Sequence, residues 1–211
     1  MATVMARCPH SKAMGSCPNC PEKYFQEKYW IHGWALDAYT RASGRTQIGE
    51  LINVIKYRLH NDPSLASIQA EVLLQILKRF LVKLYPISNR PFDCLMHPPS
   101  NTERQFHLTD FLVHKLSTPS ILNRSSELIK VRNFETVKAM SGKERVKTIP
   151  GSMQLIPNLV LPKPRGILII DDVLDTGNTA KEACRAVEVV WPGTPRYYIS
   201  LTYLLDRGTS R

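Results

Sequence analysis

The sequence has no run of about 18 consecutive apolar residues, the length that a membrane-spanning helix needs. Its first residues, MATVMARCPH, also lack the apolar core of a secretory signal. We therefore expect a cytoplasmic protein with no membrane span. Internal repeats and low-complexity tracts are missing as well. Cysteines are few, five in 211 residues, and in the cytoplasm they stay reduced, so they serve packing, metal binding or catalysis instead of disulfides.

Acidic residues are scarce, because 18 Asp and Glu stand against 28 Lys and Arg, and the net charge is +10. Such an excess favours anionic partners, namely phosphates, nucleotides, nucleic acid or acidic membrane surfaces. Charge alone does not choose among them, and a solvated, soluble surface explains it equally well. The length allows one ample domain and a small appendage, and a hydrophobic content of 43% is typical of a globular protein.

Hydrophobic spacing predicts an α/β fold. The predicted helices span residues 48–59, 65–84, 108–116 and 178–190, and the predicted strands span residues 92–96, 166–170 and 197–205. Strands that alternate with helices in the second half indicate a parallel sheet. The aromatic residues between 24 and 45 show no clear periodicity.

The segment ILIIDDVLDTGNT, residues 167–179, combines features that suit a phosphorylated sugar. Four apolar residues predict a buried strand, and Asp171 and Asp172 follow where it ends. A short loop with Gly177 then opens a helix, whose free N–H groups and positive dipole end suit a phosphate. Because carboxylates repel phosphate, the two acids should face a ribose diol or a hydrated Mg²⁺.

A plainer interpretation of this segment is a buried strand, an exposed Asp-Asp turn and an N-capped helix. That interpretation accounts for the strand and the cap. It does not account for the adjacent acids, Gly177 and the hydroxyls of Thr176 and Thr179 together.

The same thirteen positions resemble the signature of the type I phosphoribosyltransferases: four apolar residues, two acids, two variable residues and a small-residue phosphate loop ending in Gly-x-Thr. The resemblance implies a parallel-sheet core with helices on both faces and a helical hood. It implies that Asp171 and Asp172 hold the ribose hydroxyls and are catalytic together with Asp175. The implied 5′-phosphate loop consists of Asp175, Thr176, Gly177, Asn178 and Thr179.

Asp175 bears on the acceptor. In purine-salvage members of the superfamily, an acid at this loop position lies near the base and can exchange its proton. The resemblance therefore favours a purine-like base, although a helix N-cap role explains Asp175 equally well.

Within that superfamily the chain resembles the ComF group, which is associated with DNA uptake in bacteria. The shared features are a cysteine knuckle, a helical block containing Lys56-Tyr57-Arg58, a strand ending in His97-Pro98 and the stretch KAMSGKERVKTIPGSMQL, residues 138–155. Residues 103–107, ERQFH, stand where that group has Arg-Gly-Phe-Asn-Gln.

The cysteine knuckle predicts a structural zinc site. Cys17 and Cys20 have the spacing of zinc ligands, and Cys8 and His10 lie just upstream, which completes a Cys₃His set. Relatives use two Cys-x-x-Cys pairs, so His10, or else His32, would supply the fourth ligand here. A degenerate, metal-free knuckle is the alternative. We expect residues 1–35 to form this knuckle and residues 36–211 the phosphoribosyltransferase-like domain. Of the other cysteines, Cys94 and Cys184 are expected in the core.

The basic stretch 130–148 resembles the flexible catalytic loop of the same fold. There, Lys143, Arg145 and Lys147 would neutralise pyrophosphate, and a solvated charged face explains them as well. The resemblance further implies that residues 97–100 meet pyrophosphate through backbone amides. Because Pro98 and Pro99 lack N–H groups, this loop is poorly suited to that role.

Two functions follow as expectations. The first is a phosphoribosyltransferase-like enzyme that binds phosphoribosyl pyrophosphate with Mg²⁺, or a nucleoside monophosphate, and transfers phosphoribosyl to a purine-like base. The second is a non-catalytic protein of the same fold that acts in DNA uptake, DNA processing or prokaryotic defence, through DNA, RNA or a DNA-processing partner. The sequence leaves turnover open.

Overall fold

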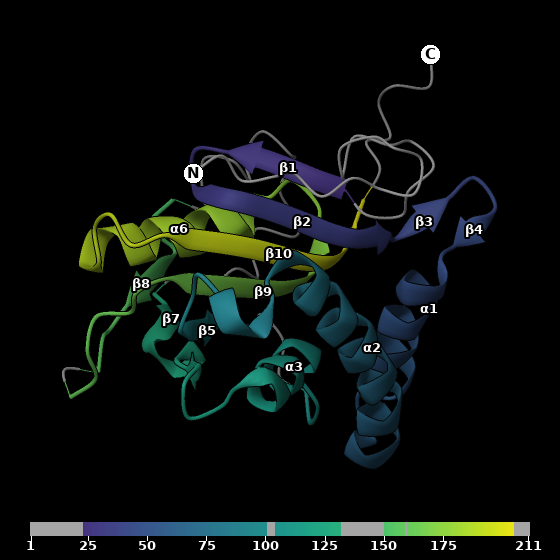
Figure 1. The fold of residues 1–211 in the computed structure, drawn as a ribbon. Helices are drawn as coiled ribbons and strands as arrows, with labels where there is room; N and C mark the ends of the chain where they lie inside the picture. Colours follow the sequence, from purple (N-terminus) through teal and green to yellow (C-terminus); the bar gives the residue numbers. More distant parts are fainter. Residues whose placement is uncertain (1–22, 101–103, 132–149, 159, 205–211) are drawn as a thin grey trace.

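The computed structural model describes residues 23–100, 104–131, 150–158 and 160–204. Six strands form the main sheet in the order β1-β2-β10-β9-β5-β6 (Figure 1). Their bounds are β1 Lys23–Glu27, β2 Trp30–Ala38, β10 Arg196–Tyr203, β9 Ile167–Leu174, β5 Cys94–Met96 and β6 Leu122–Asn123. β1 pairs with β2 in antiparallel fashion and every other pairing in this sheet is parallel. The expected α/β fold with a mostly parallel sheet is confirmed.

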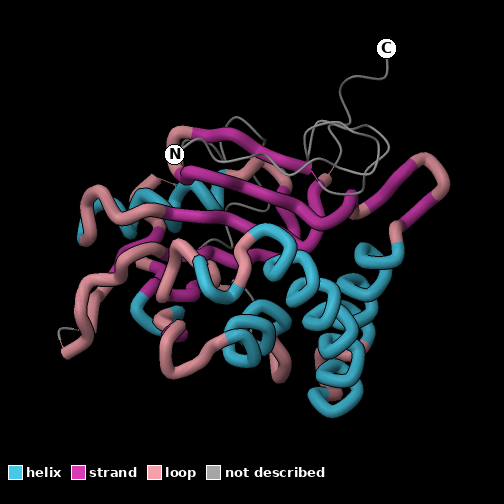
Figure 2. Tube along the Cα trace, in the orientation of Figure 1, coloured by secondary structure: helices cyan, strands magenta, loops and turns pink. Residues whose placement is uncertain are grey.

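Helices cover both faces of this sheet (Figures 1 and 2). One face packs against α1 Gln47–Asn53, the π-helical turn η1 Val54–Arg58, α2 Pro63–Leu84 and α3 Leu108–Leu116. The other face packs against α6 Asn178–Val190 and the hairpin of β7 Leu128–Lys130 and β8 Met153–Leu155. The remaining elements are β3 Thr40–Arg41, β4 Gly44–Arg45, and the 3₁₀ turns η2 Ile87–Asn89 and η3 Ser125–Glu127.

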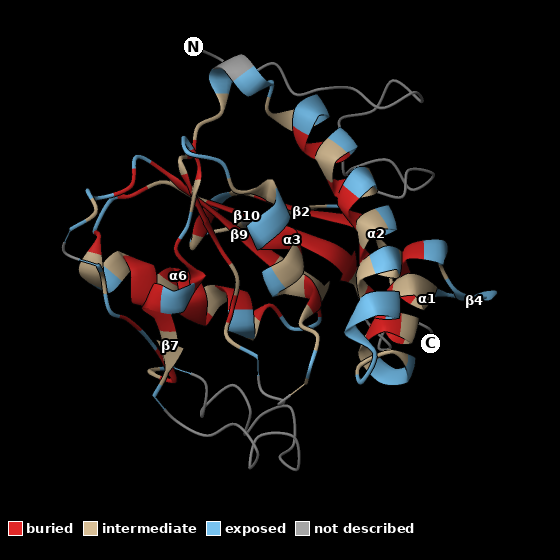
Figure 3. Cartoon of the chain, turned by 90° about the horizontal axis from the view of Figure 1, so that it is seen from below, coloured by how far each residue is buried: buried red, intermediate tan, exposed pale blue. Residues whose placement is uncertain are grey.

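The apolar composition of β9 explains its position in the middle of the sheet, between β10 and β5. Ile167, Leu168, Ile169 and Ile170 are all fully buried, and their side chains alternate between the two core clusters. A strand that is covered on both faces reads as a continuous apolar run, which is typical of a parallel sheet between helix layers. Figure 3 shows the same burial across the sheet and along the inner faces of α2 and α6.

The long helix α2 ends where expected but begins at Pro63, two residues before the expected start, and three residues of its apolar pattern, Leu65, Ile68 and Val72, do not face the core. The Asp62 side chain accepts a hydrogen bond of 3.0 Å from the N–H of Leu65, and Pro63 occupies the first turn. The buried face of α2 is a row of small and branched residues: Ala66, Ala70, Leu73, Leu74, Leu77, Phe80 and Leu81. Leu65, Ile68 and Val72 are exposed, because at helical spacing they fall on the opposite side.

The segment with no clear periodicity, residues 24–45, contains β1 and β2 of the main sheet and the short strands β3 and β4, none of which the sequence revealed. β2 buries Trp34, Ala35 and Leu36 in succession, so it lacks the alternation that marks a half-exposed strand. The expected domain boundary between residues 35 and 36 falls inside β2, which hydrogen-bonds to β10.

Several predictions concern residues outside the described ranges. These are the zinc ligands Cys8, His10, Cys17 and Cys20 and the basic residues Lys143, Arg145 and Lys147. Cys94 and Cys184 are described, and both are buried as expected. Across the described ranges, no helix has the length and apolar character required to cross a membrane.

Candidate functional site

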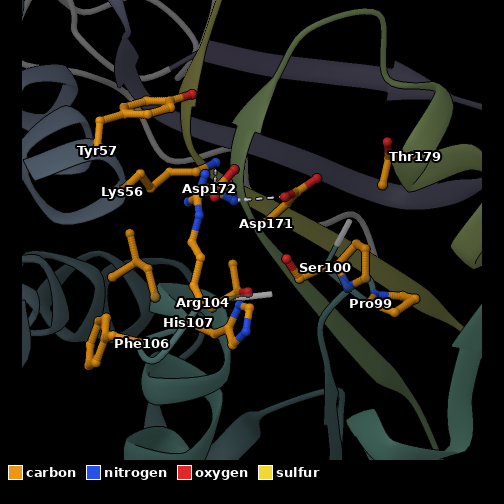
Figure 4. Close-up of a pocket in the computed structure, with 13 residues that line it drawn as sticks. Lys56, Tyr57, Pro99, Ser100, Arg104, Phe106, His107, Asp171, Asp172 and Thr179 are labelled. Carbon is orange, nitrogen blue, oxygen red and sulfur yellow. Dashed lines mark hydrogen bonds and ion pairs between the residues drawn. The ribbon is translucent and has the colours of Figure 1, made fainter. Parts of the chain in front are cut away.

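A pocket of about 260 Å³ opens where β9 emerges from the sheet (Figure 4). Four parts of the chain that are distant in sequence line it. The lining residues are Lys56, Tyr57, Pro98, Pro99, Ser100, Arg104, Phe106, His107, Leu108, Thr109, Asp171, Asp172 and Thr179. In an open parallel sheet, ligands bind at this carboxyl edge, so the location itself favours a binding site.

The two predicted acids lie together in this pocket, although they belong to the strand instead of a loop after it. β9 runs on to Leu174, beyond the expected end at residue 170, because β10 continues to pair with it through Tyr203. Asp171 accepts hydrogen bonds from the N–H of Asp172 at 2.8 Å and from the Tyr198 hydroxyl at 3.3 Å. The strand therefore holds the Asp171 carboxylate in a fixed orientation.

The Asp171 carboxyl is easier to protonate than an ordinary aspartate. Burial and the neighbouring Asp172 raise its pKa to about 7, against the lowering effects of the Asp172 N–H and Lys56. The adjacent Tyr198 hydroxyl has a pKa well above its usual value, because it is buried and lies beside Asp171. Tyr198 therefore stays neutral and donates its hydrogen bond.

Lys56 reaches the acid pair from the helical layer, 116 positions earlier in the chain. Its Nζ lies 2.5 Å from Asp172 Oδ2, and both side chains are largely shielded, with 23% and 19% of their surface exposed. Burial alone would lower the pKa of Lys56, but attraction to Asp172 outweighs it and the pKa is raised. Lys56 is thus a charged pocket residue.

Sequence reasoning did not select Lys56 as a site residue. It appeared only in the block Lys56-Tyr57-Arg58 that resembles the ComF group. The π-helical form of η1 is the kind of local irregularity that often accompanies a functional position. The sequence itself carries no sign of that turn.

The predicted phosphate loop joins β9 to α6. Gly177 is buried and has φ of 74°, a left-handed conformation that favours glycine, and it occupies the N-cap position of α6. The N-cap role considered for Asp175 is therefore taken by Gly177. Asp175 and Thr176 are exposed, and Thr179 in the first turn of α6 lines the pocket. The acids and the beginning of α6 thus border one cavity.

The opposite wall of the pocket carries aromatic and basic groups. The Arg104 guanidinium lies 5.4 Å from the centre of the Tyr57 ring, which makes a cation–π contact between the loop before α3 and η1. Burial and the nearby Arg104 lower the pKa of His107, so this imidazole is neutral at pH 7. Tyr57, Arg104, Phe106 and His107 were not selected from the sequence as site residues.

The loop after β5 forms a third wall through Pro98, Pro99 and Ser100. The N–H of His97 donates to Ser125 Oγ at 3.2 Å, and Lys130 Nζ donates to the Ser100 carbonyl at 2.8 Å. With one amide engaged and two absent at proline, this wall offers few N–H donors to an anion.

A Mg²⁺ bridging both acids does not fit the contacts seen here. Asp172 Oδ2 is taken by the Lys56 ammonium, and both oxygens of Asp171 accept hydrogen bonds. Within the described ranges, no cluster of three or more His, Cys, Asp or Glu residues is arranged to hold a metal ion. A Mg²⁺ carried by the pyrophosphate of a ligand would belong to the ligand and would need no direct bond to these carboxylates.

Comparison with known proteins adds no relative: the chain matches no protein-family model and no curated protein. The residues of the pocket are therefore the guide to what the chain binds.

Proposed function

We propose that this chain binds a phosphorylated ribose, either phosphoribosyl pyrophosphate carrying its Mg²⁺ or a ribose 5-phosphate nucleotide. We further propose that its fold is that of the type I phosphoribosyltransferases, with a ComF-like arrangement. One observation carries the proposal. The adjacent acids Asp171 and Asp172 and the first turn of α6, through Thr179, border the same pocket at the carboxyl edge of a parallel sheet.

The proposed roles follow from charge and hydrogen-bonding chemistry. Asp171 and Asp172 accept hydrogen bonds from the two ribose hydroxyls, which are donors that suit carboxylates. The N–H groups that begin α6 and the hydroxyls of Thr176 and Thr179 bind the 5′-phosphate, and the left-handed turn at Gly177 lets the backbone close around it. Phosphate and acids are thereby kept apart, as their like charges require.

Transfer to a base is the proposed reaction. The bond between ribose C1 and the pyrophosphate oxygen breaks, and pyrophosphate leaves with the bonding electron pair. A nitrogen of the base, proposed to be purine-like, bonds to C1 and gives up its proton to the departing pyrophosphate. The protein contributes positioning and electrostatic stabilisation, and the Tyr57 and Arg104 wall is where an acceptor would approach.

A second candidate, binding without turnover, is favoured by Pro98 and Pro99. These two prolines line the pocket and cannot donate N–H groups to a leaving pyrophosphate. Such a protein would act in DNA uptake, DNA processing or defence through nucleic acid or a protein partner, which suits the net charge of +10. Pyrophosphate release from phosphoribosyl pyrophosphate, measured across a panel of bases, separates the two candidates.

Calorimetric titration with ribose 5-phosphate and with a nucleoside monophosphate tests the proposed site. The double variant Asp171→Asn, Asp172→Asn should weaken binding by about tenfold or more, since hydrogen bonds to charged groups contribute about 1.5–3 kcal/mol. The matched control Glu71→Gln, Glu188→Gln also removes two acidic charges, at residues that do not line the pocket, and should bind as the wild type does. Equal affinity of the site variant and the control would refute the assignment of the acids to ribose.

A further inference from the structure

The Lys56 side chain points towards the acid pair, and its Nζ donates to Asp172 Oδ2 (Figure 4). Its partner Asp172 is adjacent in sequence to Asp171, and both carboxylates act on the lysine electrostatically. Lys56 comes from η1, whose neighbouring residue Ile55 is buried in the core between the helices and the sheet. The buried Ile55 side chain therefore fixes the position of η1, the turn that bears Lys56.

The carboxylate oxygens of Asp171 and Asp172 contact the protein and can still accept hydrogen bonds from a ligand. Lys56 contacts Asp172 Oδ2, and the other oxygen of that carboxylate can accept a hydrogen bond from a ribose hydroxyl. The Asp172 N–H donates to Asp171 Oδ1 and the Tyr198 hydroxyl donates to Asp171 Oδ2, so each of these two oxygens uses one lone pair. Carboxylate oxygens have further lone pairs, so hydroxyl donors can still be accepted.

A divalent metal ion is disfavoured at the same place by two effects. The ammonium repels another cation within a few ångströms, and this repulsion is strong where the groups are shielded from water. Mg²⁺ also requires near-octahedral oxygen ligands at about 2.0–2.1 Å, and one of the oxygens available to it is already in contact with Lys56. The other pocket cation, Arg104, lies over the Tyr57 ring.

We propose that Lys56 is the built-in counter-cation of this acid pair, so that phosphorylated ribose is held by Asp171 and Asp172 without a divalent metal ion. This inference rests on the proposed function and assigns Lys56 as a positioning residue for it. It limits any role of Mg²⁺ to a ligand that carries its own chelating pyrophosphate.

The test is calorimetric titration of the full chain with ribose 5-phosphate, which has no pyrophosphate, once with EDTA and once with Mg²⁺. Wild-type affinity should agree within about twofold between the two conditions. Lys56→Met should bind about tenfold more weakly in EDTA, the effect of losing one charged hydrogen bond, and should recover part of that loss when Mg²⁺ is added. Lys115→Met, on the exposed side of α3, is the matched control and should behave as wild type.

The outcomes separate this inference from the proposed function. Wild-type binding that requires Mg²⁺ would overturn the role of Lys56 and leave the ribose site standing, and so would a Lys56→Met variant that binds in EDTA as tightly as wild type. No wild-type binding in either condition would refute the ribose site itself. Circular dichroism checks folding. If Lys56→Met is unfolded, Lys56→Gln, which keeps a donor for Asp172 but no charge, replaces it in the same comparison.

Discussion

At the scale of single residues, the state of the pocket depends on Asp171. Burial and Asp172 favour its protonated form, whereas the Asp172 N–H, Lys56 and Tyr198 favour its charged form. Burial and Asp172 have the larger effect, so the pKa of Asp171 rises from an ordinary value near 4 to about 7. A carboxyl that titrates near neutral pH in a binding pocket is a common feature of functional sites.

This shift predicts a pH-dependent stability. Because the pKa of Asp171 is higher in the folded chain than in the unfolded chain, its contribution is fully present below about pH 4 and is lost as pH rises to about 7. Asp171→Asn keeps an oxygen acceptor for the Asp172 N–H, turns its amide NH₂ group towards the Tyr198 hydroxyl, and cannot ionise. Relative to wild type, the variant should therefore gain thermal stability between pH 5 and pH 8. A difference in melting temperature that is the same at both pH values would contradict the raised pKa.

At the scale of elements, α6 is joined to the hairpin of β7 and β8 by one buried carboxylate. Glu182 accepts hydrogen bonds from the N–H of Met153 at 3.1 Å and from Arg185, whose guanidinium also donates to the Met153 carbonyl at 2.8 Å. In sequence, β7 and β8 flank the basic stretch that contains the predicted flexible loop. The contact therefore ties β8 to the same helix that begins at the pocket.

Replacing Glu182 tests this connection. Glu182→Ala leaves the buried N–H of Met153 without its acceptor and removes the partner of Arg185, so it should lower the free energy of unfolding by about 2–3 kcal/mol. Glu50→Ala removes exposed ion pairs with Arg45 and Arg58 and should cost less than about 1 kcal/mol. Urea unfolding of the two variants measures both values. Similar losses in the two would show that the buried contact contributes little.

At the scale of the whole molecule, the net charge of +10 favours anionic partners, and nucleic acid is the one among them that a binding experiment can test directly. Binding that releases counterions weakens steeply with salt, and contacts to phosphate carry no base preference. A gel-shift titration at about 50 mM and 200 mM salt should show a large loss of affinity at the higher concentration. The variant with Lys143, Arg145 and Lys147 changed to Ala should bind more weakly at both. No shift at either concentration would leave the small-molecule site as the explanation of the charge.

The sequence by itself determined those parts whose signals are local. α2 begins at Pro63, directly after its N-cap Asp62, because a capping side chain and a fixed proline φ act on neighbouring residues. β9 and α6 were likewise predicted from a continuous apolar run and the glycine that follows it. Their order along the chain placed the acids and the beginning of α6 at one edge of a parallel sheet, before any contact was known.

Only the tertiary structure decided how the pocket is closed and charged. Lys56 and Asp172 are 116 positions apart, and neither residue carries a local mark of the other. The strand β2 escaped prediction because it buries Trp34, Ala35 and Leu36 in succession, which removes the alternation that marks a half-exposed strand. Pairing with β10 extends β9 past its apolar run and through the acid pair. The hydrophobic periodicity of a helix or strand reflects which of its faces is exposed to water. An ion pair inside a pocket depends instead on how two elements that are distant in sequence pack together.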